Sequence, residues 1–469
     1  LGLPFAGVLI QQAATHRMNL LVDSTPVPNW VMLFSKFLAL LGMCVVLMVT
    51  AIVSGMLVQA YYGYYNFEPG VYIRDLLGFR MINFVILIVL ALFIQSLFRN
   101  YMLGFIVILV VKMIPLGLNK IGVELPVFHF DSAPGIAYSD MNGFGSFRGH
   151  LIWKFYWLLF CGVLYGLTLL LWRRGSFSGV KDRIRTAVSR FRGPVAVPML
   201  LSLAAFGTLG YALYYSIAVA KPFYTGQERE QRIIAYEKNY KRYAGTPQPR
   251  ITDAKVEMHI FPKERNYNAT GYFTMVNKSG KAIDSLIVDY GKNLRSIHFD
   301  LPHQQIFDDS LSRFRIYRLE SPLLPGDSLQ VKIIVENARN TWLADESPVL
   351  ENGTFINNFE LFPAFGYQES SEIQDNDVRK KYGLKDRERM AEPTDNKARQ
   401  NNYISSNGDW IRFEATVSTS EDQIAIAPGY LQKEWTENGR KYFHYKMDKP
   451  ILNFYAFNSA LLRCPERSL

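Results

Sequence analysis

The seven histidines are the residues with which this chain could hold a catalytic metal. They are His16, His129, His150, His259, His298, His303 and His444. A hydrolytic zinc site needs ligands at helical i, i+4 spacing or an equivalent cluster, with one position left for water. No H-E-x-x-H is present, and the closest pair, His298 and His303, lies five apart around Pro302 in a β context. The sequence therefore predicts no metal site and no zinc-dependent hydrolysis by this chain alone.

The sequence also has no motif for phosphate binding, for a disulfide framework or for nucleophilic catalysis. A phosphate-binding loop needs G-x-x-x-x-G-K-[ST], and the nearest approach, Gly175 to Gly179 followed by Val180-Lys181, has the wrong spacing. The cysteines Cys44, Cys161 and Cys464 offer neither a disulfide framework nor metal-ligand spacing. Neither a Ser-His-Asp nor a Cys-His arrangement can be argued from spacing. We assign no catalytic, cofactor-binding or metal-binding residue.

The stretch from Pro194 to Ala220 contains no charged residue and is long enough to cross ~30 Å of hydrocarbon. Similar stretches precede it, whereas the sequence becomes polar after Lys221. We expect a polytopic helical membrane bundle over 1–220, followed by an all-β antiparallel sandwich or saddle. The expected spans are about 37–60, 81–98, 101–118, 152–172 and 195–220.

The spans contain no Asp or Glu, but one of them contains Lys112. Ionisable residues inside a membrane are candidates for function. Because the spans offer no acidic partner, we expect Lys112 to snorkel or to face the bundle, and we expect no proton or ion relay.

The connection between the last two spans is strongly basic. From Arg173 to Arg192 it carries seven positive charges and one negative charge, or +6 of the chain's net +10. Basic residues in short loops favour the cytoplasmic side. We interpret this connection as a topogenic loop, not a nucleic-acid site, which places residues beyond 220 outside the cytoplasm.

The second half begins with an expected juxtamembrane helix and linker, 221–249. Residues 250–460 then show period-two alternation with turn residues between short runs, which is typical of an antiparallel sandwich. A polar insertion at 368–402 has a short helix expected near Asp377–Tyr382. Strands are expected at Trp410–Ser418, Gln423–Ala427, Lys441–Met447 and Leu452–Phe457.

A succession of short motifs in this chain resembles bacterial proteins that fuse an ABC-exporter-type permease to an aminopeptidase N-family metallopeptidase. The motifs are Ser24–Pro28 with Ser35-Lys36, Tyr236–Tyr243, Pro247–Pro249, Asn352–Phe355, Phe362-Pro363, Gly366-Tyr367, Arg379–Leu384, Phe413–Tyr430, Phe457 and Ser459-Ala460. The resemblance implies permease helices over 1–220 and, over 250–460, the extracytoplasmic N-terminal β domain of the peptidase. It also implies a bacterial inner membrane as the location.

In that family a zinc-binding catalytic domain with Gly-x-Met-Glu-Asn and H-E-x-x-H follows, and this chain has neither motif. The resemblance therefore implies a fusion protein that lacks its catalytic domain here, with zinc and peptide substrate expected only when that domain is present. Residues 461–469 depart from the family pattern, which suggests an aberrant or truncated tail, and Leu1–Ile10 resembles the end of a helix. A glutamine or glutamate of this β domain assists substrate binding in many relatives. Asn357 and Asn358 lie near that region.

The resemblance also implies partners. The lipid bilayer is one, and a separate ABC-type ATPase docking on the polar segment Arg17–Trp30 is another; no nucleic acid is expected. Two other functions remain open: a membrane-anchored extracytoplasmic β-sandwich that binds a ligand, and a plain export permease with an external accessory domain.

Overall fold

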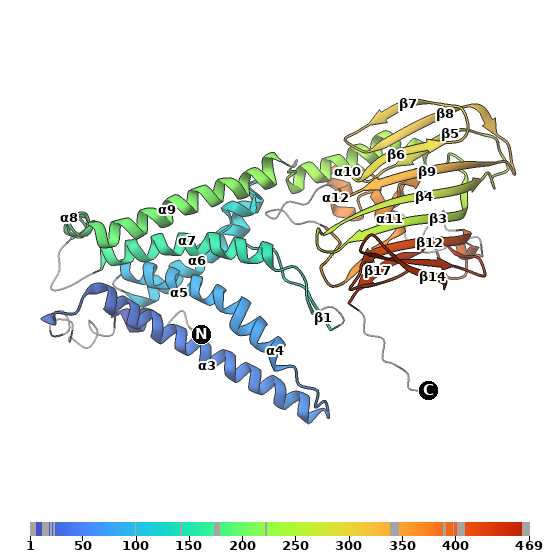
Figure 1. Ribbon diagram of the computed structural model, residues 1–469. Coiled ribbons are helices and arrows are strands. Elements are labelled where there is room, and N and C mark those ends of the chain that lie inside the picture. The colour runs from blue at the N-terminus through green and yellow to red at the C-terminus, as the bar shows by residue number, and fades with distance from the viewer. Residues whose placement is uncertain are drawn as a thin grey trace, which may run out of the picture. The chain divides into compact units, whose positions relative to one another are not determined.

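The computed structural model describes residues 6–11, 18, 21, 24–98, 100–140, 143–172, 179–220, 223–337, 347–387, 391–396, 398–400 and 409–461. The chain divides into two compact units (Figure 1). The first, the helical unit, comprises Leu1–Gly135 and Arg148–Phe223, and the second, the β unit, comprises Ile136–Phe147 and Tyr224–Leu469.

The helical unit is built on long apolar helices. They are α3 (Asn29–Tyr61), α5 (Met81–Leu97), α6 (Tyr101–Lys120), α7 (Arg148–Leu171) and α9 (Gly193–Tyr214). Short α4 (Pro69–Tyr72) and the π-helical η1 (Ile73–Arg80) lead into α5, and π-helical η3 (Tyr215–Val219) extends α9. With these extensions, the described residues contain five helices of 20 to 33 residues that are long and apolar enough to cross a membrane. This confirms the expected membrane bundle.

Small residues let α7 and α9 approach closely. Gly162 and Gly166 lie four apart on α7, the small-xxx-small spacing that favours packing of membrane helices. A Cβ at Gly162 would lie 2.7 Å from Ser202 Oγ, and one at Gly166 would lie 2.9 Å from Met199 Cγ. The absence of a side chain at these two glycines therefore makes room for Ser202 and Met199 of α9.

Part of the basic connection between the last two spans is helical. Residues 173–178 lie outside the described part, but Val180–Arg190 forms helix α8. The expectation of a loop is therefore incomplete, because apolar residues at helical spacing let this segment fold as a short amphipathic helix.

The β unit contains one large sheet and smaller ones. Its strands are β1 (Tyr138–Ser139), β2 (Gly143–Phe144), β3 (Arg250–Phe261), β4 (Asn266–Val276), β5 (Ile283–Asp289), β6 (Leu294–Phe299), β7 (His303–Asp309), β8 (Phe314–Leu323), β9 (Ser328–Glu336), β10 (Thr354–Asn357), β11 (Ala364–Phe365), β12 (Trp410–Ser420), β13 (Ile424–Ile426), β14 (Tyr430–Glu437), β15 (Arg440–Lys446), β16 (Ile451–Leu452) and β17 (Ala456–Ala460). The large sheet has the order β14-β15-β12-β3-β4-β9-β6, with β16 paired to β12. Figure 1 labels β12, β3, β4, β9 and β6 along this sheet. The smaller sheets are β11-β5-β8-β7, β10-β17-β13 and β1-β2.

The expectation of a purely antiparallel unit requires one correction, because β12 pairs with β3 in parallel, with Val417 opposite Met258. Parallel neighbours need a long crossover, and the 150 or so residues between these strands contain β4 to β11 and the polar insertion. The core forms where one face of the large sheet packs on the smaller sheets, through fully buried residues such as Met258, Phe413 and Phe457.

Helix α10 (Gly226–Tyr240), continued by 3-10 helical η4 (Lys241–Tyr243), belongs to the β unit. It begins at a capping box in which Thr225 Oγ1 accepts from the Glu228 backbone N–H and Glu228 accepts from the Thr225 backbone N–H. Its buried Tyr236 and Tyr240 pack on Ile287 of β5 and on neighbouring residues of β8. The expected juxtamembrane helix is therefore part of the β unit's structure.

A buried ion pair fixes α10 more firmly. The Arg379 guanidinium donates two hydrogen bonds to the Glu237 carboxylate, at 2.9 and 2.7 Å, and both side chains are only 3% exposed. Arg379 lies on α12 (Asn376–Lys381), which confirms the short helix expected near Asp377–Tyr382. Burial alone would raise the pKa of Glu237, but hydrogen bonds from Arg379 and Lys241 outweigh it, so this pKa lies below its ordinary value.

Tyr236 makes the other polar contact of α10. Its hydroxyl donates to Asp289 Oδ2 at 2.9 Å and accepts from the Gln368 backbone N–H at 3.0 Å. Burial raises the pKa of Asp289 to about 6, while the bond from Tyr236 and the charge of Arg313 oppose that rise. Glu237 and Tyr236 thus tie α10 to the insertion and to β5.

Candidate functional site

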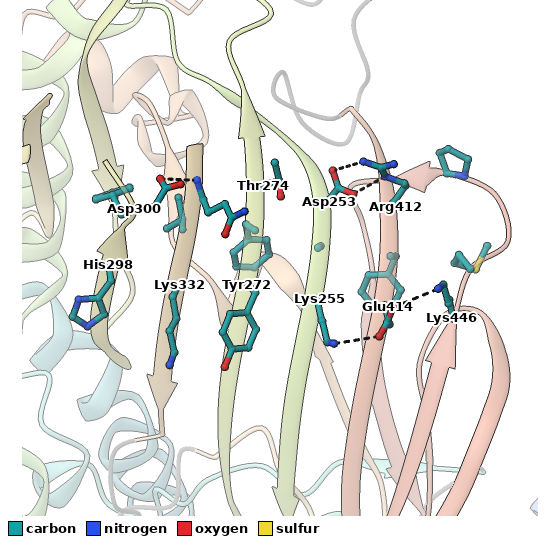
Figure 2. Close-up of a pocket in the computed structure, with 18 of the residues that line it drawn as sticks. Asp253, Lys255, Tyr272, Thr274, His298, Asp300, Lys332, Arg412, Glu414 and Lys446 are labelled. Atoms are coloured by element: carbon teal, nitrogen blue, oxygen red, sulfur yellow. Dashed lines mark hydrogen bonds and ion pairs between the residues drawn. The ribbon is translucent and has the colours of Figure 1, made fainter. Parts of the chain in front are cut away.

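One face of the large sheet packs on the core, and the other is open and polar. In β3, Ala254, Val256 and Met258 are buried, whereas Lys255 and Glu257 between them are not. Since successive side chains of a strand point to opposite faces, the same division holds across the neighbouring strands. The open face carries a groove of about 830 Å³ (Figure 2).

The first row of groove residues crosses six neighbouring strands in register. It consists of His298, Lys332, Tyr272, Lys255, Glu414 and Lys446. Figure 2 shows these side chains side by side along the sheet. Because neighbouring strands lie about 4.8 Å apart, chemical groups repeat along this row at that spacing.

Three lysines and one glutamate give the first row an excess of positive charge. Glu414 lies 3.4 Å from Lys255 Nζ and 3.8 Å from Lys446 Nζ, and both lysine side chains are more than half exposed. Lys332 Nζ lies 5.4 Å from the centre of the Tyr272 ring, and Lys332 makes no ion pair with any described residue. The row therefore places a lysine on each side of an exposed aromatic ring, with Lys255 paired to Glu414 and Lys332 unpaired among the described residues.

The second row lies two residues further along the strands. It consists of Asp300, Gln330, Thr274, Asp253 and Arg412. Arg412 donates two hydrogen bonds to the Asp253 carboxylate, at 2.5 and 3.1 Å. Partial burial alone would raise the pKa of Asp253, but the bonds from Arg412 and Thr252 hold that pKa below its ordinary value. Asp253 therefore stays ionised and is already paired.

The groove can bind a ligand by charge and hydrogen bonding. Among its lining residues, Tyr272 and Thr274 carry hydroxyls, but neither is hydrogen-bonded to a general base. A nucleophile that is to be activated needs a base within hydrogen-bond reach. The groove thus fits non-covalent recognition of a ligand, and the excess of positive charge in its first row favours negatively charged groups there.

The four histidines of the β unit lie on separate strands. His259 is on β3, His298 on β6, His303 on β7 and His444 on β15. His298 belongs to the first row, whereas His303 lies in the four-stranded sheet. His259 Nδ1 hydrogen-bonds Ser418 Oγ at 2.8 Å, and burial followed by the charge of Arg440 lowers the pKa of His259.

The residues in the described ranges form no group of three or more His, Cys, Asp or Glu side chains that could hold a metal ion. The zinc that the family resemblance implies therefore does not fit the described part of this chain. His16 and Cys464 lie outside those ranges, while His129 and His150 bind backbone oxygens of Val123 and Pro134.

The expectation that Lys112 lacks an acidic partner is wrong. Lys112 Nζ lies 2.8 Å from Asp131 Oδ2, and Lys154 Nζ of α7 lies 2.7 Å from Asp131 Oδ1. Asp131 comes from the loop between α6 and α7, and the Trp157 indole N–H fixes that loop by donating to Ser132 O at 2.9 Å. Composition of the spans alone could not reveal this partner, because it comes from outside them.

Asn357 and Asn358 have structural contacts. Asn357 Oδ1 accepts from the backbone N–H groups of Phe359 and Glu360, which caps α11 (Asn358–Leu361). Asn358 is buried and accepts from the Tyr455 backbone N–H at 3.1 Å. Their amide oxygens thus stabilise the turn that follows β10.

The fold and the groove together define an integral membrane protein with a large, open-faced β unit. Comparison with known proteins adds a limited likeness. No family model matches the sequence, and no curated protein does. Among solved structures, the chain is similar to an M1 zinc metallopeptidase from Deinococcus radiodurans, with 12% identity, a TM-score of 0.28 and coverage of 45% of this chain and 43% of that one.

A second similar structure is a two-domain M1 zinc metallopeptidase mutant bound to L-arginine, with 12% identity, a TM-score of 0.27 and the same coverage of 45% and 43%. The chain thus spans less than half the length of these structures.

Proposed function

We propose that this chain is the membrane-embedded and accessory part of a permease–aminopeptidase fusion protein, and that its β unit binds peptides without cleaving them. The succession of family-like motifs and the five apolar helices support the fusion. The basic segment that contains α8 supports a location of the β unit outside the cytoplasm.

The binding function rests on the first row of the groove, where Lys332 and Lys255 lie on the two strands on either side of Tyr272. Two strand spacings put the two lysine positions roughly 10 Å apart. A peptide in the extended polyproline II conformation has three residues per turn and advances about 3.1 Å per residue, so side chains three residues apart point to the same side and lie about 9 Å apart. Peptides with carboxylates three residues apart are therefore the ligand class that fits best.

The binding prediction concerns the double variant Lys255→Glu/Lys332→Glu. Fluorescence anisotropy of a labelled extended peptide with glutamate at every third position should show binding to the purified full chain. Reversing both charges should weaken this binding by about tenfold, because two attractive contacts become repulsive. A peptide with lysine in place of each glutamate should bind weakly to the unmodified chain.

The matched control is Lys263→Glu/Lys281→Glu, which changes the net charge equally at two exposed lysines that do not line the groove. This control should bind the acidic peptide as the unmodified chain does. Equal losses in both double variants would show that only overall charge matters and would remove the groove from the proposal.

The permease role requires an energy source that this chain does not supply, since it has no phosphate-binding loop. A separate ATPase docking on residues 17–30 is the proposed partner, and co-purification from native membranes in mild detergent tests it.

A further inference from the structure

Helix α8 presents apolar side chains to the outside of the helical unit. Ile184, Val188 and Phe191 are 56%, 69% and 42% exposed. They lie at i, i+4 and i+7, so they share one face of the helix, Phe191 at its C-terminal end. Ser189, also exposed, lies on another side of α8.

Two arginines hold α8 at the ends of membrane helices. Arg183 donates to the carbonyl oxygens of Ser96, at 2.9 Å, and Leu97, at 3.2 Å, in the last turn of α5. It also donates to Leu171 O at the end of α7, at 3.0 Å. These are the terminal carbonyls that a helix leaves unsatisfied, and a cation is favourable at the negative end of the helix dipole.

Arg190 makes a similar contact about two turns later. It donates to Trp172 O, just beyond α7, at 2.5 Å and to Leu170 O at 3.4 Å. Two donors seven residues apart therefore fix both ends of α8 against the same helix terminus. Since α5 and α7 are apolar spans, their ends mark the level where hydrocarbon meets headgroups.

The remaining charges on and beside α8 match that level. Lys181 and Arg185 are exposed on α8, Arg192 is exposed beyond it, and Asp182 is the one acid in Gly179–Arg192. Including Arg183 and Arg190, this stretch carries five basic residues against that acid. A surface with apolar anchors and a basic flank fits an anionic lipid interface.

We propose that α8 is an interfacial anchor whose Ile184, Val188 and Phe191 enter the bilayer surface while Lys181 and Arg185 bind anionic phospholipid headgroups. Arg183 and Arg190 fix the position of α8 relative to the membrane surface, because they bind backbone carbonyl oxygens at the ends of α5 and α7. The anchor thus fixes the cytoplasmic ends of α5 and α7 to the lipid surface.

The test uses the full chain with Cys464→Ser and the buried Cys44 and Cys161 retained. A polarity-sensitive fluorophore is attached to Val188→Cys or, as the matched control, to Ser189→Cys. The Cys464→Ser chain without an introduced cysteine is treated with the same reagent and gives the background labelling. In vesicles of phosphatidylcholine and phosphatidylglycerol, lipids spin-labelled near the headgroup should quench most emission from position 188. Aqueous iodide should quench position 189 instead.

Lys181→Gln/Arg185→Gln tests the headgroup contact. In the labelled Val188→Cys chain, lipid quenching should be stronger with phosphatidylglycerol than with phosphatidylcholine alone, and the double variant should abolish that difference. Equal quenching at positions 188 and 189 would overturn the anchor, and an unchanged preference in the double variant would overturn the role of the two basic residues.

Discussion

Replacing Arg379 with methionine should lower the free energy of unfolding of the β unit by about 3–5 kcal/mol. The variant leaves the Glu237 carboxylate, 3% exposed, and the neighbouring Glu372 carboxylate, 6% exposed, without their buried cation. It also removes hydrogen bonds to Ile373 O and Lys385 O. Circular dichroism of the purified full chain should show the β signal melting roughly 10 °C lower.

The matched control is the neighbouring Lys380→Met, because Lys380 is 62% exposed and lies 3.7 Å from Asp386, which is 55% exposed. Its melting temperature should change little, since exposed ion pairs contribute about 0–1 kcal/mol. Glu237→Gln should cost less than Arg379→Met, because Arg379 keeps Glu372 within 3.8 Å. Equal shifts for Arg379→Met and Lys380→Met would contradict the buried-pair interpretation.

The second large effect is expected in the helical unit. Asp131→Asn should destabilise it by about 3–5 kcal/mol, because one carboxylate balances two lysines and Lys154 is only 5% exposed. The measurement is the temperature at which the purified chain aggregates in detergent. Asp140→Asn, at an exposed position, is the matched control.

Two substitutions in the cluster of Lys112, Asp131 and Lys154 should differ in their cost, which a general loss of packing would not explain. Lys154→Met should cost less than Asp131→Asn, because it leaves the pair of Lys112 and Asp131 intact and places an apolar side chain among the helices. If Lys154→Met were the more damaging change, the carboxylate would not be the centre of the cluster.

Helices and strands could be predicted where the pattern of apolar residues within one segment of sequence indicates them. Apolar runs predicted all five candidate membrane helices of the described residues, although α3 begins at Asn29 instead of near 37. Alternation predicted β12 and β15, because one side of each is buried. Strand β14 was missed because nearly all of its residues are exposed, so burial imposes no period of two on it.

The groove could not be predicted because it depends on the order of strands. Lys255 and Tyr272 come from the consecutive strands β3 and β4, but Lys332 comes from β9, which is distant in sequence and pairs beside β4. The parallel pairing of β12 with β3 then places Glu414 beside Lys255. The alternation within a strand predicts which of its residues share a face, but it does not predict which strands pair beside it.

We propose that the membrane helices carry the β unit outside the cytoplasm, where its groove can meet peptides. Thiol labelling tests this directly in the Cys464→Ser parent, with a cysteine at Ser328 of β9 or at Ser189 of α8, both exposed positions. In intact cells a membrane-impermeant reagent should label the cysteine at 328 but not the one at 189, and permeabilised cells should label both. Labelling at 189 and not at 328 in intact cells would place the β unit in the cytoplasm and contradict the account.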